Sequence, residues 1–362
     1  MKIAVLGTRG IPASYGGFET FAEELSTRLA ARGHSVTVYC RSHHTDRSLR
    51  EYRGVRLVVL PTVRSKYLDT VVHTFLSSLH SVRGRFDAVL YCNAINALFC
   101  WIPRRMSGSR VVLNVDGLER NRRKWNALGR AAYSVAERLS TKFPDAVVTD
   151  AEVIRGYYRE QFGIDPLMIP YGGDLPRPAG TDMLAKLGLE KDGYFLYVSR
   201  LEPENNALAV VEAYRRVKGA VPLVIVGDAP YAAGYIRRVK SAADSRVLFP
   251  GAVYGEGYRE LLFHARAYIQ ATEIGGTHPA LVEAMGAGRV VAYHDSRENR
   301  EVCGDAGVPF DASRPESLSA ILGSLLDDPD RFNVFSERAL RLVQERYRWE
   351  DITDRYERAL EG

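Results

Sequence analysis

The stretch Thr272–Val290, which reads TEIGGTHPALVEAMGAGRV, decides the fold of this chain. An apolar run at 267–270 precedes it and a second apolar run at 290–293 follows it. Between them lie a glycine-rich turn and a short helical pattern that carries Glu283 and ends at Gly286–Gly288. The order strand, glycine-rich turn, helix, strand is typical of a βαβ unit in a parallel sheet.

The turn in this stretch has the chemistry of an anion site. A glycine-rich turn that opens a helix leaves backbone N–H groups free, and the helix dipole favours negative charge there. Glu283 lies about one turn into the helix, where it could reach the hydroxyls of a ligand whose phosphates sit at the helix start. A nucleotide-sugar offers both groups. The alternative is an ordinary crossover whose glycines only form the turn, and the spacing does not choose between the two.

Length and composition indicate a globular protein with two domains. The chain has 362 residues, 46% hydrophobic and 26% charged, which favours two α/β domains. The apolar stretch 88–103 contains Asn93 and Asn96 and is too short for a transmembrane helix. No secretion signal follows Met1, and the four cysteines lack metal-ligand spacing. We therefore expect a cytoplasmic protein with reduced thiols.

Charge is distributed unevenly along the chain. Residues 1–174 contain 25 Lys and Arg against 16 Asp and Glu, whereas the remainder contains 24 against 28. A basic N-terminal half predicts a partner with phosphates or an anionic membrane surface. The alternative is a solvated basic face without a partner. A nucleic-acid partner is disfavoured because the basic residues are scattered and no binding motif accompanies them.

The N-terminal half alternates strands and helices, which predicts a doubly wound parallel sheet. Ligands of such sheets bind beyond the carboxyl ends of the strands. That edge should carry the glycine-rich loop at 7–17, with Arg9 and Tyr15, together with Asn93 and Asp116. Strands are expected at 2–7, 35–40, 55–60, 88–92, 110–115, 146–149 and 167–169, and helices at 18–32, 68–82, 123–140 and 151–161.

A segment rich in Pro and Gly at 170–180 separates this half from a second strand–helix series. We predict an acceptor-binding domain at 1–174, a nucleotide-sugar-binding domain at 175–345, and a terminal helix at 346–362 that packs back on the first domain. Strands are expected at 195–199, 222–226, 247–249 and 267–270, and helices at 207–218, 235–243 and 256–265. Two such domains would face each other across a central cleft.

Arg200 directly follows one of these strands. Its planar guanidinium could bind a diphosphate. The alternative is an ion pair with Glu202 or Glu204.

Several motifs in order resemble the two-domain glycosyltransferases of the GT-B fold, family GT4, the glycosyl transferases group 1. They are Gly16-Gly17, Pro170-Tyr-Gly-Gly-Asp174, Ser199-Arg200-Leu201, Pro250-Gly251-Ala252-Val253 and the run 279–285. Further motifs resemble a branch associated with rhamnosyl transfer in bacterial surface polysaccharide assembly. These are TRGIP at 8–12, YGGFET at 15–20, LEPENN at 201–206 and the Gly275–Pro279 turn.

The resemblance implies roles for particular residues. Gly16 and Gly17 would approach the donor phosphates, Arg200 would contact the donor diphosphate, and Glu283 would bind the ribose hydroxyls. Val253 and Tyr254 lie where the family's base-contacting loop lies. With Gly276 and Thr277 of the turn, these residues form the predicted donor site.

Three positions depart from the family pattern. Gly275 stands where the first glutamate of the Glu-x7-Glu motif is expected, Asn205 replaces a lysine, and Asp116 replaces a histidine. The missing glutamate and histidine would read sugar hydroxyls, and the lysine would help hold the leaving diphosphate. We expect Arg9 to compensate in part. His278 stands where the branch more often has Asn, and it could tune the choice of sugar.

The resemblance implies a retaining glycosyltransferase that moves a sugar, rhamnose by the branch, from a nucleoside-diphosphate sugar to a glycan or lipid-linked acceptor. No metal is expected, because no Asp-x-Asp or His/Cys cluster is present. Asp116 is predicted to orient the acceptor hydroxyl or stabilise the transition state. Arg9, Tyr15, Asn93 and Glu119 are the other candidate acceptor contacts.

Two alternatives remain open: a non-catalytic nucleotide-sugar-binding protein, and a nucleotide-sugar epimerase of the same fold. The basic stretch that contains Trp125 is a candidate for peripheral contact with the anionic inner membrane face, or else a solvated helix face. Its basic residues are Arg120, Arg122, Arg123, Lys124 and Arg130. The sequence leaves the acceptor, the linkage, the donor base and the oligomeric state open.

Overall fold

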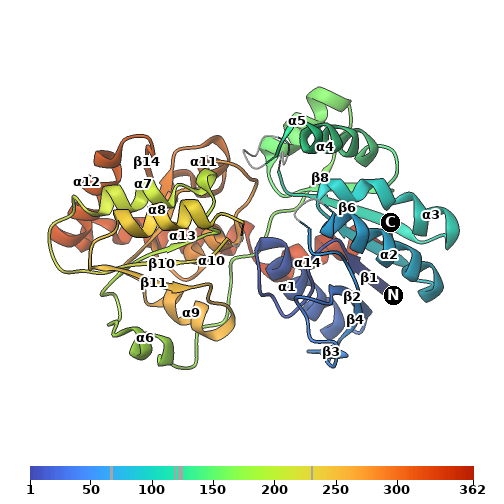
Figure 1. Cartoon of the computed structure of the whole chain (residues 1–362), viewed down its shortest axis with the longest axis horizontal. Helices are drawn as coiled ribbons and strands as arrows, with labels where there is room; N and C mark the ends of the chain where they lie inside the picture. The colour runs from blue at the N-terminus through green and yellow to red at the C-terminus, as the bar shows by residue number, and fades with distance from the viewer. Residues whose placement is uncertain (66–67, 118–119, 121–124, 230) are drawn as a thin grey trace. The chain divides into compact units, whose positions relative to one another are not determined.

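A computed structural model describes residues 1–65, 68–117, 120, 125–229 and 231–362 of the chain. It divides the chain into two compact units (Figure 1). Unit 1 comprises Met1–Tyr171 together with Trp349–Gly362, and unit 2 comprises Gly172–Arg348. No helix in the described part of the chain is both long and apolar enough to cross a membrane.

Unit 1 is built on an eight-stranded sheet in the order β3-β4-β2-β1-β5-β6-β7-β8, parallel except for the β3–β4 pair. Its strands are β1 (Lys2–Leu6), β2 (Ser35–Arg41), β3 (Glu51–Tyr52), β4 (Val55–Leu60), β5 (Ala88–Cys92), β6 (Arg110–Val115), β7 (Ala146–Thr149) and β8 (Leu167–Met168). Its helices are α1 (Gly17–Ala31), α2 (Asp69–Gly84), the 3-10 helix η1 (Ala94–Phe99), α3 (Trp101–Met106), α4 (Ala127–Ser140), α5 (Glu152–Phe162) and α14 (Trp349–Glu361).

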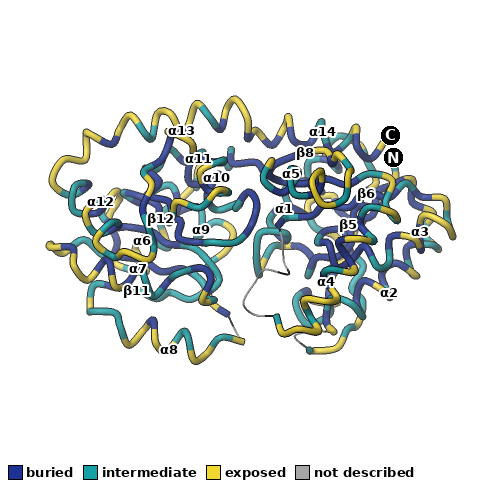
Figure 2. The backbone as a smooth tube through the Cα atoms, turned by 90° about the horizontal axis from the view of Figure 1, so that it is seen from above, coloured by how far each residue is buried: buried dark blue, intermediate teal, exposed yellow. Residues whose placement is uncertain are grey.

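Two apolar layers enclose this sheet. On one face, α1 and α14 pack over the side chains of Ile3 and Val5. On the other face, η1 and α5 cover Ala4 and Leu6. The alternation follows from strand geometry, because successive side chains point to opposite faces. Figure 2 shows the central strands of this unit buried and the outer turns of its helices exposed.

Unit 2 contains a six-stranded parallel sheet in the order β11-β10-β9-β12-β13-β14. Its strands are β9 (Phe195–Val198), β10 (Leu223–Val226), β11 (Val247–Gly251), β12 (Ala267–Gln270), β13 (Val290–His294) and β14 (Val308–Phe310). Its α-helices are α6 (Asp182–Leu187), α7 (Ala207–Tyr214), α8 (Ala233–Ala242), α9 (Gly255–Phe263), α10 (Pro279–Gly286), α11 (Arg297–Cys303), α12 (Pro315–Asp327) and α13 (Asn333–Arg346). The short 3-10 helices are η3 (Pro203–Asn205), η4 (Gly304–Ala306) and η5 (Pro329–Phe332). Helices α7, α8 and α12 cover one face of the sheet, and α6, α9, α10, α11 and α13 cover the other.

The structure corrects several predicted boundaries. The helix expected at 207–218 ends at Tyr214, whose hydroxyl donates to the Val221 carbonyl and fixes the turn that follows. The helix expected at 123–140 begins at Ala127, and residues 123 and 124 lie outside the described residues. The strand β3 and the helices α3 and α6 were not predicted, because each is only two to six residues long and carries no distinct periodicity.

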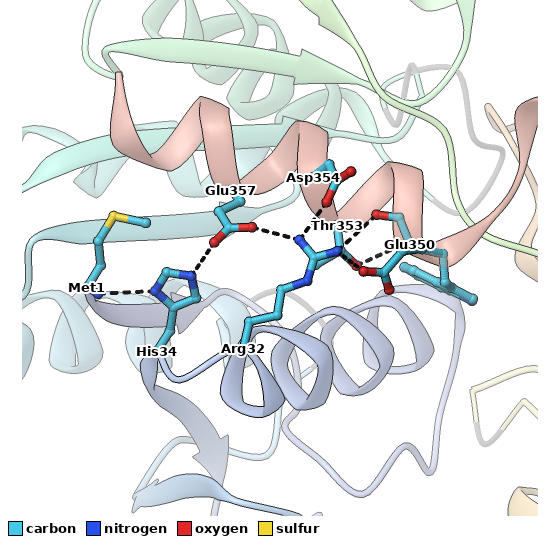
Figure 3. Close-up of polar contacts among 8 residues, drawn as sticks. Met1, Arg32, His34, Glu350, Thr353, Asp354 and Glu357 are labelled. Atoms are coloured by element: carbon cyan, nitrogen blue, oxygen red, sulfur yellow. Dashed lines mark hydrogen bonds and ion pairs between the residues drawn. The ribbon is translucent and has the colours of Figure 1, made fainter.

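The outermost contact of α14 with α1 is an ionic network around Arg32 (Figure 3). Arg32 Nη1 lies 2.6 Å from Glu357 Oε2 and 2.7 Å from Asp354 Oδ1, and its Nη2 binds the Glu350 carboxylate. Glu357 Oε1 also lies 2.6 Å from His34 Nε2. One arginine thus joins three carboxylates of the last helix to the end of α1.

Helix α2 has a polar buried side. Its buried residues are Asp69, His73, Thr74, Ser77, Ser78 and Ser81. The sheet beneath it presents tyrosine hydroxyls: Ser78 Oγ lies 2.7 Å from Tyr91 Oη, and His80 Nδ1 lies 3.0 Å from Tyr39 Oη. Polar residues face the sheet here because those hydroxyls need hydrogen-bond partners when they are buried.

The Arg32 network predicts how firmly α14 is held. In Arg32→Ala, three carboxylates lose their common cation, and we expect unit 1 to lose about 1–2 kcal/mol of unfolding free energy. Hydrogen exchange of the α14 amides should be faster in this variant. The matched control is Arg216→Ala, which removes only an exposed pair with Glu316 at 3.2 Å. Equal exchange rates in α14 for both variants would contradict the assigned role of Arg32.

The buried imidazole of His73 predicts a pH dependence. Burial, reinforced by the Arg41 charge, lowers the pKa of His73 to about 4. The unfolded chain therefore binds a proton between pH 6.5 and 4 that the folded chain does not, and stability falls as the pH falls through this window. We expect this residue to make unit 1 about 2 kcal/mol less stable at pH 5 than at pH 7. Urea unfolding at both pH values measures the difference.

The variant His73→Gln is the control for this pH dependence. Its amide can still donate to the Cys40 carbonyl that His73 Nε2 contacts at 3.1 Å, but it does not titrate. If the variant loses as much stability between pH 7 and pH 5 as the native chain does, another group is responsible.

Candidate functional site

The loop between β1 and α1 brings two predicted residues together. The Arg9 guanidinium lies over the Tyr15 ring, and the Tyr15 ring meets His44 edge-on at 5.9 Å between centroids. The Arg9 amide donates to Glu19 Oε1 at 2.8 Å, which fixes the loop against α1. Gly10 has a φ of +114°, and a Cβ there would lie 2.6 Å from Cys40 Sγ. Only glycine allows this close approach.

Gly16 and Gly17 stand at the start of α1. Helix α1 begins at Gly17, and the carbonyl of Gly16 accepts hydrogen bonds from the amides of Glu19 and Thr20. Gly16, at the N-cap position, has no side chain that could cap this end. The glycine pair therefore has the position that a close approach of phosphate requires, and the contact with donor phosphates stays a prediction.

Asn93 and Asp116 follow neighbouring strands β5 and β6, as predicted. Asn93 caps η1, because its Oδ1 accepts from the Ile95 amide at 3.1 Å. Asp116 lies close enough to Tyr171 to act on it: burial, then Asp116 and Asp150, raise the pKa of Tyr171 well above its usual value. Sequence reasoning missed Asp150, although it follows β7 just as Asp116 follows β6.

The candidate membrane stretch is described only in part. Arg120 Nε lies 3.6 Å from Glu137 Oε2, and Arg130 Nε donates to the Trp125 carbonyl at 3.1 Å. Arg122, Arg123 and Lys124 lie outside the described residues, as does the candidate acceptor residue Glu119.

A cluster of His43, His44 and Asp69 lies at the end of β2 and the start of α2. One ligand atom of each falls within 4.8 Å of the others, which is a metal-like spacing. However, Arg41 Nη1 already binds Asp69 Oδ2 at 2.6 Å. Burial, then the charges of Arg9, His43 and Arg41, lowers the pKa of His44 to about 4. Such positive surroundings favour an anion over a cation.

In unit 2, Arg200 leaves β9 within a tightly held loop. The Asn205 side chain donates to the Arg200 carbonyl at 2.6 Å, so the residue that replaces a lysine fixes the loop instead of supplying charge. Arg200 Nη1 lies 3.6 Å from Glu202 Oε1. The predicted alternative of an ion pair with Glu202 is therefore formed in this structure.

The Arg200 loop is tied to the glycine-rich turn after β12. The Glu273 amide donates to the Glu204 carbonyl at 3.1 Å, and Asn206 Nδ2 donates to the Ala271 carbonyl at 2.9 Å. Since β9 and β12 are neighbours in the sheet, both loops occupy the same edge. Arg200 and the Gly275–His278 turn are thus brought together as predicted.

His278 fills the space that a side chain at position 275 would need. A Cβ built on Gly275 would lie 2.4 Å from His278 Cε1 and 3.0 Å from its Nε2. Gly276 and Thr277 are buried beside it. The His278 ring therefore occupies the space beside Gly275, and the role of either residue in sugar choice stays a prediction.

Glu283 is buried on α10, and its Oε2 accepts a hydrogen bond from the Tyr258 hydroxyl of α9. Burial and the Glu283 carboxylate raise the pKa of Tyr258 well above its usual value. The tyrosine therefore stays protonated and donates, which holds the carboxylate in one orientation. Tyr254 precedes α9 and is exposed, whereas Val253 is partly buried against the core.

The two edges differ in what they offer chemically. The edge of unit 2 combines a cation, a helix start and an oriented carboxylate, which together suit a nucleoside diphosphate. The edge of unit 1 combines Arg9 with carboxylates after β6 and β7, which suits an acceptor hydroxyl.

The contact between Gly275 and His278 can be tested by stability. Gly275 is not in the left-handed region, so Gly275→Ala should cost stability only by forcing the His278 ring to move, by about 1 kcal/mol. Without the His278 ring the added methyl group has nothing to displace. The double variant Gly275→Ala/His278→Ala should therefore be as stable as His278→Ala alone. Thermal unfolding of all four proteins completes the cycle. An equal cost of Gly275→Ala with and without the ring would refute the contact.

Comparisons with known families match the two halves of the chain separately. Residues 1–174 match the family described as Domain of unknown function (DUF1972), and residues 192–328 match Glycosyl transferases group 1. The chain is 22% identical to a lipopolysaccharide 1,2-N-acetylglucosaminetransferase of Salmonella typhimurium, over 77% of this chain and 79% of that protein.

Two further similarities extend over nearly the whole chain. It is 24% identical to a GDP-mannose-dependent alpha-(1-6)-phosphatidylinositol monomannoside mannosyltransferase of Mycolicibacterium smegmatis, over 99% of this chain and 98% of that protein. The structure of Anabaena HepE, solved in complex with UDP and glucose, superposes with a TM-score of 0.80 at 16% identity and covers 99% of both chains. The chain therefore has the GT-B fold, carries a glycosyl transferases group 1 domain in unit 2, and is a glycosyltransferase.

Proposed function

We propose that this protein transfers a sugar from a nucleoside-diphosphate sugar to a glycan or lipid-linked acceptor in the synthesis of a bacterial surface polysaccharide. The observation that carries the proposal is the donor edge of unit 2, where Arg200, the glycine-rich turn and the buried Glu283 lie within the matched transferase domain. The similarity to a lipopolysaccharide N-acetylglucosaminetransferase supports the acceptor class.

In this proposal Arg200 and the helix N-termini stabilise the diphosphate as negative charge develops on it. Glu283, oriented by Tyr258, binds the ribose hydroxyls. Asp116 orients the acceptor hydroxyl. The anomeric configuration is retained, and no resident metal takes part. Rhamnose is the proposed sugar, on the LEPENN and GGT-x-P motifs.

The acceptor end of the reaction is proposed to lie at the cytoplasmic face of the inner membrane. Arg9 and Tyr15, which form one stacked pair, are the proposed contacts for the acceptor. Asn93 caps a helix, so any contact with the acceptor would come from its side-chain NH₂ group.

The test is nucleoside-diphosphate release from a panel of nucleotide-sugars, dTDP-rhamnose included, with and without a bacterial lipid extract. We expect release with one donor that depends on the extract. Arg200→Ala should lower kcat/KM about 100-fold, because it removes a preorganised cation from the leaving group. The exposed Arg216 provides the control variant Arg216→Ala, which should leave turnover unchanged.

Three outcomes would overturn parts of this proposal. Release without acceptor would favour an epimerase, and tight nucleotide binding without release would favour a binding protein. Acceptor-dependent release from a donor other than dTDP-rhamnose would refute the sugar and retain the reaction.

A further inference from the structure

A cavity of about 500 Å³ lies between helices α4 and α5 of unit 1. The two helices lie side by side (Figure 1) and are joined by two side-chain contacts. The Tyr157 hydroxyl donates to Glu137 Oε2 at 3.1 Å, and Ser140 Oγ lies 3.2 Å from Tyr158 Oη. A cavity of this size accommodates a small ligand. None of the described candidate donor or acceptor residues lines it.

The cavity extends away from the sheet edge that carries Asp116 and Asp150. Those aspartates follow the ends of β6 and β7, where ligands of parallel sheets usually bind. Helices α4 and α5 instead end shortly before β7 and β8 begin, and several lining residues lie in or directly after their last turns. The side chains of the cavity are therefore not explained by the candidate acceptor edge.

Positive charge predominates around the cavity. The described lining contains Arg120, Arg138 and Lys142 against one carboxylate, that of Glu137. Arg120 Nε lies 3.6 Å from Glu137 Oε2, so this pair largely balances itself. Arg138 and Lys142 are exposed and form no ion pair with any described residue. These two cations are complementary to a negatively charged ligand group.

The rest of the lining suits a sugar ring. Tyr157 and Phe162 contribute aromatic surface, with 5.9 Å between their ring centroids. Glu137 is buried, and its contacts with Tyr157 and Arg120 both use Oε2, which leaves Oε1 to accept a hydrogen bond. The exposed amide of Gln161 both donates and accepts. Apolar ring surface beside such groups matches the C–H faces and the hydroxyls of a saccharide.

We propose that this cavity binds an acidic saccharide, that is, a sugar unit that carries a carboxylate or a phosphate group. The negative group pairs with Arg138 and Lys142, and the ring lies against Tyr157 and Phe162. An inorganic anion would leave the aromatic surface uncovered, and a neutral saccharide would leave the two cations without a partner. In a glycosyltransferase such a site holds a part of the glycan other than the hydroxyl that reacts.

Titration calorimetry of the full chain tests the proposal with two matched ligands, digalacturonate and its methyl ester, which has the same rings without the charges. We expect the acid to bind about tenfold more tightly than the ester, and the difference to shrink with added salt. Galactose 1-phosphate and inorganic phosphate form a second pair. The sugar phosphate should bind more tightly than phosphate, and the tighter of the two acidic sugars identifies the preferred negative group.

Variants assign the binding to the cavity. Arg138→Gln/Lys142→Gln should weaken digalacturonate binding about tenfold and leave ester binding unchanged, because only the acid uses the cations. Gln161→Ala should weaken both ligands about threefold, because both lose one hydrogen bond. The matched control Arg216→Gln/Lys218→Gln removes the same charges from exposed residues of unit 2 and should bind as the native chain does. Thermal unfolding checks that each variant folds.

Two results would overturn the proposal. One is equal affinity for the acid and the ester, or the absence of binding to both. The other is native affinity for digalacturonate in the folded double variant. Inorganic phosphate that binds as tightly as galactose 1-phosphate would reduce the cavity to a site for an adventitious ion only. The titrations contain no nucleotide-sugar and measure no turnover, so their failure is distinct from a failure of the proposed reaction.

Discussion

The position of the Glu283 carboxylate depends on a contact between two backbones. A Cβ on Gly173 would lie 2.3 Å from the Val282 carbonyl oxygen, and a Cβ on Gly286 would lie 2.1 Å from the Gly173 carbonyl oxygen. The segment after Pro170 therefore lies directly on α10, one residue from Glu283. Because no side chain separates them, small changes in either backbone would move the carboxylate.

The sequence predicts the alternation of strands and helices in both units, because buried parallel strands read as short apolar runs bounded by glycine. It does not predict which side of a helix is buried. The apolar residues of α2 recur with helical spacing, yet Tyr39 and Tyr91 beneath the helix select its polar side. Which side of α2 is buried therefore depends on Tyr39, 30 positions before the helix, and on Tyr91, after it. A local sequence pattern does not include these residues.

Sequence analysis identifies the residues of the candidate site only where they belong to a recognisable motif. Arg200 lies just beyond β9 and Glu283 lies within α10, the helix that follows β12, and β9 and β12 are neighbours in the sheet. The packing role of Gly275 could not be predicted from the sequence. A side chain at position 275 would collide with the His278 ring, and that contact is visible only in the structure. Arg41, buried at the end of β2 with Asp69, carries no motif and is visible only in three dimensions.

The course of the chain through unit 1 has a consequence for its synthesis. Residues 1–171 need the last helix, because Trp349 and Tyr356 pack against Phe21 in the same core. All of unit 2, residues 172–348, is made before that helix exists. On the ribosome, unit 2 can complete its core as one contiguous segment, whereas unit 1 must wait with an apolar surface on α1 uncovered. During that interval the uncovered face of α1 is the kind of exposed hydrophobic surface that makes folding intermediates prone to aggregate.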